Sequence, residues 1–362
     1  MQKIHWSLIL VPVALAVRYL AASHETLIFV LAAIAMIPLA KLLSDSTEQT
    51  AYKTGPTLGA LLNVTFGNAG ELLIGFFALK AGLQQLVKAS ITGSILVNLL
   101  LTLGISMLAG GIRKKTLSFN PLSARTQTTM LGLAAISLVL PAAFSLLGGA
   151  ATDSGLRDLS LEFSIVLAIL YGLSLLFTLH THEQLLTPHK AEEGDAPEGT
   201  WSTARALTTL VVSAALVAWM GEVLVGSIEA ASRSLGMTEL FAGLVVVAIA
   251  GNAAEATAAV RAALNNRMDL SVGIAAGSSI QVALFVAPLL VIISQWVSPR
   301  PMDLVFTPVE IVALVLAVVI TSQVASDGQS NWLEGAQLLA VYVMLAVMFF
   351  YLPAGEPAKS GH

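Results

Sequence analysis

Long apolar runs separated by short polar stretches dominate this chain. Each run is close to the ~20 residues that an α-helix needs to cross the hydrocarbon core of a bilayer. The pattern predicts an all-α polytopic membrane protein with eleven transmembrane helices. The predicted helices cover 4–20, 26–43, 56–80, 89–109, 128–147, 159–179, 206–228, 240–264, 270–296, 304–324 and 332–352.

Polar stretches divide the chain into regions. Residues 1–24 hold an accessory first helix, which lacks a small-residue cleavage site and is therefore counted as a span. The regions 25–180 and 204–353 hold five predicted helices each, with a polar connector at 44–54. Between the two regions, 181–203 is an acidic linker that carries Glu192, Glu193, Asp195 and Glu198.

Composition agrees with a membrane protein. Of the 362 residues, 56% are hydrophobic and 11% are charged, whereas soluble domains carry about 25% charged residues. The chain has no cysteine, which excludes disulfide and zinc-thiolate chemistry. The net charge of -4 is spread along the chain, and no basic arm indicates nucleic-acid binding.

The distribution of Lys and Arg predicts the orientation. More of them fall on the face that holds the N-terminus, the acidic linker and the Arg113-Lys114-Lys115 cluster than on the opposite face. Because positive loops stay on the cytosolic side, we expect the N-terminus and the linker to be cytosolic. The short termini favour the cell (inner) membrane of a prokaryote; in a eukaryote the vacuolar membrane is expected.

The second half of the chain repeats the first at a constant spacing of 184 residues. This spacing relates Gly67 to Gly251, Glu71 to Glu255 and Gly93-Ser94 to Gly277-Ser278. Five helices per repeat is an odd number, so the second repeat enters the membrane from the opposite side. The sequence therefore predicts two inverted-topology five-helix repeats, with a substrate site where they meet near the midplane.

Two carboxylates in duplicated motifs mark that site. Glu71 follows Asn68, and Glu255 follows Asn252, by three residues, so each pair shares a helix face. A charged side chain at the bilayer centre costs about 2.5 to 3.5 kcal/mol on insertion scales. One such Glu can be a packing feature, but two in repeated motifs indicate a function. The adjacent glycines allow local unwinding that frees backbone carbonyls.

The helices after each motif supply further oxygen atoms. Candidate ligands besides the two Glu and two Asn are Ser94, Asn98, Ser278, Ser279 and Gln281. An all-oxygen shell with two negative charges suits a hard divalent cation, and flexible coordination suits Ca²⁺ better than Mg²⁺. Without the cation, two neighbouring buried acids resist ionisation, so one Ca²⁺ and two H⁺ compete for the same oxygens.

Other acidic residues have simpler interpretations. Glu162, Glu310 and Glu334 lie in the first turns of their predicted helices, where water or the positive helix end accommodates a carboxylate, so structural roles are expected. The four linker acids are either a solvated loop or a device that gathers cytosolic Ca²⁺.

These motifs resemble the calcium/proton exchanger family of the cation/calcium exchanger superfamily. The resemblance spans about 12–351 and rests on GNAGELLIGFFALK at 67–80, KASITGSILVNLLLTLG at 88–104, GNAAEATAAVRAALNNRMDL at 251–270, GSSIQVALFVAPLL at 277–290 and SNWLEGAQLLAVYV at 330–343. It implies eleven helices in two inverted five-helix repeats plus one, and no cofactor besides the transported ions. It also implies Ca²⁺ binding and proton carriage by Glu71 and Glu255, surrounded by Asn68, Asn252, Ser94, Asn98, Ser278 and Gln281.

The resemblance sharpens the expected function and leaves alternatives. We expect an antiporter that exports cytosolic Ca²⁺ in exchange for H⁺ by alternating access. Sodium-driven relatives are expected to hold an acid near Gln281, so the neutral amide favours protons; a Na⁺/Ca²⁺ exchanger and a Mn²⁺-preferring exchanger stay open.

Many members of the family have His directly after the second motif, where this chain has Ala256. An intramembrane aspartyl-type protease is disfavoured because no Gly-x-Gly-Asp occurs. Stoichiometry and a homo-oligomer also stay open.

Overall fold

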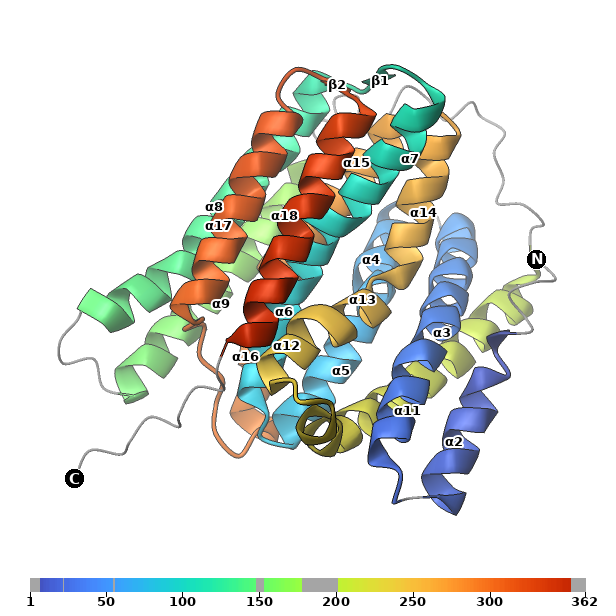
Figure 1. Cartoon of the computed structure of the whole chain (residues 1–362), viewed down its shortest axis with the longest axis vertical. Coiled ribbons are helices and arrows are strands. Elements are labelled where there is room, and N and C mark those ends of the chain that lie inside the picture. The colour runs from blue at the N-terminus through green and yellow to red at the C-terminus, as the bar shows by residue number, and fades with distance from the viewer. Residues whose placement is uncertain (1–6, 22, 55, 148–152, 178–200, 353–362) are drawn as a thin grey trace.

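The protein is a bundle of helices with one small strand pair (Figure 1). The computed structural model describes residues 7–21, 23–54, 56–147, 153–177 and 201–352. The helices are α2 (Leu10–Leu20), α3 (Glu25–Thr54), α4 (Pro56–Gly67), α5 (Ala69–Lys80), α6 (Gln84–Leu96), α7 (Leu103–Arg113), α8 (Pro121–Leu147), α9 (Asp153–Leu176), α11 (Thr203–Leu235), α12 (Glu239–Phe241), α13 (Ala248–Gly251), α14 (Ala253–Leu264), α15 (Met268–Gln281), α16 (Ala287–Val297), α17 (Pro308–Val324) and α18 (Trp332–Tyr351). Three π-helical segments, η1 (Val97–Thr102), η3 (Ala242–Val247) and η4 (Val282–Val286), and the strands β1 (Leu117–Ser118) and β2 (Gln329–Ser330) complete the described elements.

The predicted polytopic membrane architecture is confirmed. Among the described residues, seven helices are long and apolar enough to span a bilayer, and nine spans result if each of two bent helix pairs counts as one. The outer faces of α8, α9 and α18 are apolar and exposed, at Ile136, Ile169 and Val343 for example, as lipid contact requires. The shorter apolar helices α2 and α17 stand where the first and tenth helices were predicted, and α2, with 11 residues, is too short by itself for a full span.

The prediction of a polar connector at 44–54 is wrong, because α3 continues through this stretch to Thr54. Its hydroxyl groups are satisfied within the helix: Thr47 donates to Leu43 O and Thr50 to Ser46 O. Ser46 also faces Ser213 of α11 at 3.4 Å between the two hydroxyl oxygens. A polar stretch therefore stays helical here because its side chains pair with the helix backbone and with a neighbouring helix.

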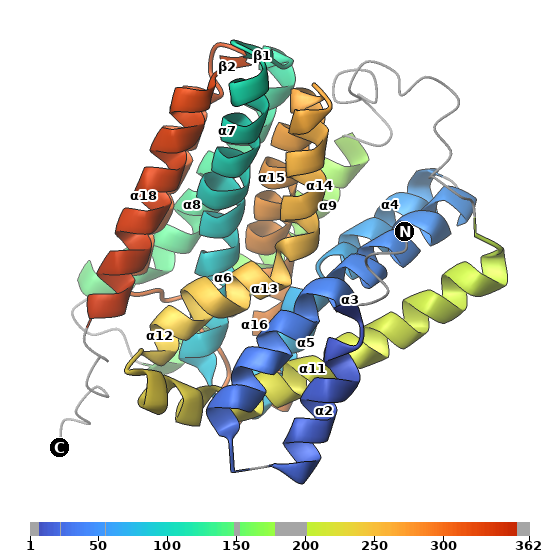
Figure 2. The same ribbon diagram turned by 45° about the vertical axis from the view of Figure 1, so that its right-hand side comes forward.

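Helix boundaries recur at the same 184-residue spacing as the motifs. α5 and α14 end 184 residues apart, as do the starts of α6 and α15 and the ends of α7 and α16. The rods α6–η1–α7 and α15–η4–α16 contact each other and run in opposite directions along the bundle (Figures 1 and 2). Each rod contains a π-helical segment near its middle, a feature that is frequent at functional sites.

One close helix contact has no counterpart in the other half of the chain. α6 packs against η3 so tightly that a Cβ added at Gly93 would overlap Leu244 O, and one at Gly243 would lie 2.7 Å from Ala89 Cβ. Gly277 is related to Gly93 by the repeat, yet a Cβ added there would meet no heavy atom within 4 Å. The two halves are thus similar in sequence but differently packed.

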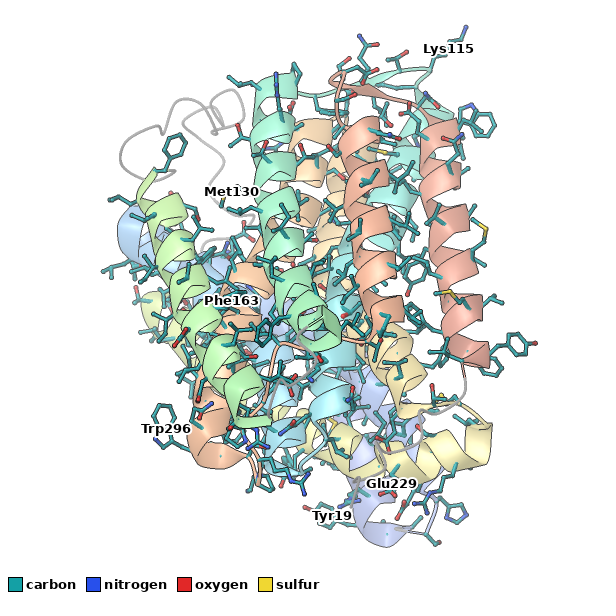
Figure 3. All side chains as sticks on the ribbon, turned by 90° about the vertical axis from the view of Figure 1, so that its left-hand side faces the viewer. Tyr19, Lys115, Met130, Phe163, Glu229 and Trp296 are labelled. Carbon is teal, nitrogen blue, oxygen red and sulfur yellow. The ribbon has the colours of Figure 1, made fainter. Side chains whose placement is uncertain are left out.

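The two ends of the bundle are polar. Figure 3 places Lys115 at one end and Tyr19, Glu229 and Trp296 at the other. We call the first the Arg113 end, since it holds Arg113 and the β1–β2 pair, in which Leu117 pairs with Ser330. The second is the Lys88 end, where the buried Lys88 Nζ lies 2.5 Å from Asp303 Oδ1 and 2.9 Å from Val305 O.

Candidate cation-binding site

Two broken helices meet in the middle of the bundle (Figure 2). The predicted helices 56–80 and 240–264 are each interrupted at the Asn of the repeated motif, with bends of 50° between α4 and α5 and 57° between α13 and α14. Asn68 and Asn252 occupy the N-cap positions of α5 and α14. Glu71 and Glu255 are therefore third residues of half-helices whose positive ends lie inside the protein, where an anionic group is stabilised.

Neither Asn caps its helix through its side chain. Asn68 Nδ2 instead donates to Gln281 Oε1 at 2.6 Å, and Asn252 Nδ2 donates to Ser94 Oγ at 2.9 Å. These bonds join each broken helix to the rod of the other half. They hold the amide groups in fixed positions beside the carboxylates.

Asn98, in η1, is the centre of a second set of bonds. Its Nδ2 donates to Asn252 Oδ1 at 2.8 Å and to Ser278 Oγ at 2.9 Å. Its Oδ1 is buried and accepts no hydrogen bond among the described residues. An unpaired buried amide oxygen costs free energy on the scale of a lost hydrogen bond, so this oxygen is available to a ligand.

The two carboxylates lie against the break in α13–α14. Glu71 Oε1 is 3.4 Å from the point where a Cβ of Gly251 would stand, so any side chain there would crowd it. The charges of Glu71 and Glu255 are close enough to repel. Glu255 Oε2 is buried and, within the described part of the chain, has no hydrogen-bond partner. Asn98 Oδ1 and Glu255 Oε2 are thus buried acceptors without donors among the described residues. A cation bound between them and Glu71 would supply the missing partner.

The structure brings together eight of the nine candidate ligands named from the sequence, all except Ser279. They are Asn68, Glu71, Ser94, Asn98, Asn252, Glu255, Ser278 and Gln281. Their role as cation ligands stays a prediction. Across the described residues, no three His, Cys, Asp or Glu side chains form a metal cluster, so amide and hydroxyl oxygens would supply the rest of the shell. The four acids of the linker lie outside the described residues.

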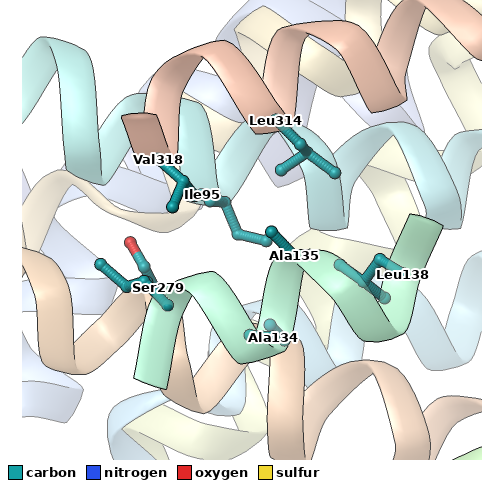
Figure 4. Close-up of a pocket in the computed structure, with 9 residues that line it drawn as sticks. Ile95, Ala134, Ala135, Leu138, Ser279, Leu314 and Val318 are labelled. Carbon is teal, nitrogen blue, oxygen red and sulfur yellow. The ribbon is translucent and has the colours of Figure 1, made fainter. Parts of the chain in front are cut away.

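Ser279 does not belong to this site. Its hydroxyl donates to Ala275 O within α15. It lines a mainly apolar cavity between α6, α8, α15 and α17 (Figure 4), together with Ile95, Ala134, Leu138 and Leu314. The cavity volume of about 10 Å³ is close to what one water molecule needs. Adjacent serines thus face different surroundings because successive residues of a helix point about 100° apart.

An open hollow lies along α14. It has a volume of about 430 Å³ and is lined by Ala256, Thr257, Val260, Arg261 and Leu264. Its lining residues begin one residue after Glu255, and α14 runs from the centre of the bundle toward the Arg113 end (Figure 2). Ala256, where related sequences were expected to carry His, lies at its inner limit.

Three buried hydroxyls near the site were missed in the sequence. Thr102, Ser106 and Ser271 are fully buried, and their hydroxyl oxygens have no hydrogen-bond partner among the described residues. The spacing of Asn98, Thr102 and Ser106, four residues each, was the available signal. It places all three on one helix face.

Comparisons with known proteins identify the family and the fold. The family model described as sodium/calcium exchanger protein matches residues 24–180 and 205–351. A protein of Aphanothece halophytica named Ca(2+)/H(+) antiporter is 44% identical over 361 residues, covering 96% of this chain and 95% of its own length. The vacuolar calcium ion transporter of Schizosaccharomyces pombe is 40% identical over 351 residues, with 96% and 84% covered. The solved structure of the Ca2+/H+ antiporter protein YfkE superposes with a TM-score of 0.84 at 37% identity, covering 97% of this chain and 100% of that one.

Proposed function

Because the chain belongs to the sodium/calcium exchanger family, we propose that it is a secondary transporter that moves Ca²⁺ out of the cytosol in exchange for H⁺. The observation that carries the proposal is the pair of buried, unpartnered oxygens, Glu255 Oε2 and Asn98 Oδ1, beside the Glu71 carboxylate. Hard divalent cations prefer carboxylate and amide oxygens. Similar proteins named Ca(2+)/H(+) antiporter support the same pair of ions.

Exchange follows from competition at the two carboxylates. Ca²⁺ binds their ionised forms, and protons neutralise the same oxygens when Ca²⁺ leaves. The empty site with two negative charges is the costly state inside a membrane. If only the calcium-loaded and protonated forms change sides, movement of one ion requires return of the other.

Gln281 favours H⁺ over Na⁺ as the exchanged ion. Its Oε1 accepts a hydrogen bond from Asn68 Nδ2 at 2.6 Å, so a neutral amide lies beside the two carboxylates. A carboxylate at this position would add the negative charge that favours binding of Na⁺. Na⁺/Ca²⁺ exchange is the alternative, because the matching family is described by sodium and calcium together. A preference for Mn²⁺ would use the same oxygen ligands.

We propose eleven spans in two inverted repeats with alternating access between them, the accessory helix at 1–24 standing outside the repeats. The opposite directions of α6–η1–α7 and α15–η4–α16 support the inversion. The tight contact at Gly93 and the open space at Gly277 support two conformational states of the transporter, which differ in which repeat is tightly packed. The hollow along α14 supports access from the Arg113 end in the state described. In the other state, Gly277 would form the close contact and Gly93 would lose it.

The orientation is proposed from charge. The basic cluster at Arg113 supports a cytosolic location for the Arg113 end, the N-terminus and the acidic linker. The linker acids would then meet Ca²⁺ on the side from which it is exported. The host membrane is proposed to be a prokaryotic cell membrane, or a vacuolar membrane in a eukaryote.

The decisive test is ⁴⁵Ca²⁺ uptake into proteoliposomes driven by either a pH gradient or a Na⁺ gradient. The Glu71→Gln protein serves as the blank because it keeps the side-chain shape and removes the charge. We expect uptake with an acidic interior and none in the blank. Uptake that requires internal Na⁺ and ignores the pH gradient would assign the protein to sodium exchange. Normal uptake by Glu71→Gln would refute the site.

A further inference from the structure

Three fully buried hydroxyls form a row from the central site toward the Arg113 end. Thr102 and Ser106 follow Asn98 at intervals of four residues, so the row extends about 12 Å along the helix axis. None of the three hydroxyls (Thr102 Oγ1, Ser106 Oγ and Ser271 Oγ) has a hydrogen-bond partner among the described residues. Many other buried hydroxyls of the bundle are paired, as in Ser227 donating to Val223 O and Ser164 to Ser160 O. Some are not, among them Ser232 and Tyr342. Thr102, Ser106 and Ser271 stand out as three unpaired hydroxyls on the facing helices next to the central site, and this grouping needs an explanation.

The row faces the interface of α7, α14 and α15. Gly110 is the next residue at the same interval after Ser106, and a Cβ there would lie 3.2 Å from Ala263 O of α14. Ser271 lies seven residues before Ser278, which accepts a hydrogen bond from Asn98, so it stands on the face of α15 that looks toward this rod. The α14 side of the interface is lined by small buried residues such as Ala259.

From this geometry we propose that the three hydroxyls bind a file of water molecules, which supplies water and protons to the central site by a route separate from the cation route. Each hydroxyl can donate and accept one hydrogen bond to water. A proton moves along such a file when each oxygen accepts one proton and releases another, so no group is consumed. The presence of the water file does not depend on the proposed function. Its role in carrying protons rests on the proposed exchange of Ca²⁺ for H⁺.

The composition of the two routes explains their division. The hollow along α14 is open and has a volume of about 430 Å³, so a hydrated cation has room in it although its lining includes Arg261 besides Thr257 and Val260. The hydroxyl row faces the opposite, buried side of α14, where Ala259 lies, and its three side chains are uncharged. Neutral hydroxyls cannot replace the full hydration shell of a divalent cation, whereas water needs only a few polar partners. The row therefore admits water and excludes Ca²⁺.

The water file can be tested without measuring transport. Brief radiolysis of water generates hydroxyl radicals at bound waters, and mass spectrometry then reports oxidation of adjacent side chains. Leu103 and Met107 flank the row and are almost fully buried, as are their matched controls Leu39 and Met36 in α3. We expect Leu103 and Met107 to be oxidised several-fold faster than the control of the same residue type. Equal rates would show that the interface is dry and would overturn the proposal.

Variants link the labelling to the hydroxyls. The triple variant Thr102→Val, Ser106→Ala, Ser271→Ala should reduce oxidation of Leu103 and Met107 to the control rates. Ser227→Ala, which removes a buried hydroxyl that is already paired, should leave them unchanged. Unchanged labelling in the triple variant would overturn the assignment of the waters to these side chains. Because Thr→Val and Ser→Ala remove unpaired groups at nearly constant shape, folding is expected to survive.

Transport by the triple variant tests the separate routes. We expect the Ca²⁺-dependent shift in thermal unfolding to persist, while proton-driven ⁴⁵Ca²⁺ uptake falls at least tenfold. Loss of the thermal shift would mean that the hydroxyls support the cation itself, which would overturn the separation. Positive labelling of the wild-type protein together with Na⁺-driven uptake would refute the proposed function and leave the water file standing.

Discussion

Glu255 and Glu310 occupy the same position in their helices and differ in what surrounds them. Each is the third residue of a helix, after the N-cap residues Asn252 and Thr307. Glu310 is fully buried, and its Oε2 accepts hydrogen bonds from Thr307 N at 2.9 Å and Thr307 Oγ1 at 2.8 Å. Its Oε1 accepts from Thr92 at 3.3 Å. Glu255 Oε2 is also buried and accepts none from the described residues.

The difference arises at the N-cap. Thr307 forms a capping box with Glu310, so the carboxylate is used by the helix that carries it. Asn252 directs its amide to Ser94 and Asn98 and makes no cap bond, so the Glu255 carboxylate keeps a free oxygen. Glu310 is therefore satisfied by its own helix, whereas Glu255 has a buried oxygen that is available to a ligand.

Neutralising the two acids should separate these roles most strongly. Glu255→Gln is expected to lower proton-driven ⁴⁵Ca²⁺ uptake in proteoliposomes more than ~100-fold, since the charge that binds Ca²⁺ is lost and each 1.4 kcal/mol is a factor of ten. Glu310→Gln should keep uptake within about twofold. Thermal unfolding in detergent checks that both proteins are folded. Equal losses of uptake in the two variants would break the comparison.

Removing the positive charge of Lys88, near Glu310, should lower the stability of the protein. Lys88 pairs with Asp303, which is 27% exposed, at the Lys88 end. Lys88→Met should lower the free energy of unfolding by about 3 kcal/mol, the lower part of the range for breaking a buried ion pair because Asp303 keeps some contact with water. Denaturant unfolding in mild detergent measures the change. Lys80→Met at an exposed position should change it by less than about 0.5 kcal/mol.

Calcium itself should stabilise the protein through the central site that holds Glu255, and not through Glu310. At 100 times its dissociation constant, Ca²⁺ should add about 2.7 kcal/mol to the free energy of unfolding. The gain should shrink as pH falls, because Ca²⁺ binds the ionised carboxylates and protons compete for them. Removal of Ca²⁺ by a chelator should reverse it. Glu310→Gln should keep this calcium effect and Glu255→Gln should lose it; a gain that grows at acidic pH would contradict the competition.

The smallest effect is expected at the cap of α17. Thr307→Ala removes the side chain that bonds Glu310 and should cost about 1 kcal/mol of stability, with uptake unchanged. Thr307→Ser keeps the hydroxyl and should restore stability in the same unfolding measurement. If Thr307→Ala instead reduced uptake as Glu255→Gln does, Glu310 would have a role in transport.

Several properties were predictable because they are encoded locally. An apolar run of sufficient length reports a span wherever it packs, and the predicted membrane architecture and family resemblance are confirmed. The spacing of 184 residues and the two Glu in duplicated motifs also need no knowledge of neighbours. Six of the eight predicted site residues form pairs at this spacing, whereas Asn98 and Gln281 were named as polar residues of the helices that follow the motifs. The linker acids lie outside the described residues.

Other properties depend on contacts between segments distant in sequence. The stretch 44–54 appears polar and is helical, because its hydroxyls pair with the backbone and with α11. Gly93 and Gly277 are equivalent in the repeat, yet only Gly93 is tightly packed. The free oxygen of Glu255 and the unpaired row at Thr102 and Ser106 are likewise visible only once the partners of every buried group are known. The sequence by itself determined the membrane architecture, the repeated motifs and the presence of the two acids, since these can be recognised from the order of residues. Tertiary packing alone decided which buried groups are satisfied, since their partners lie up to 222 residues away along the chain.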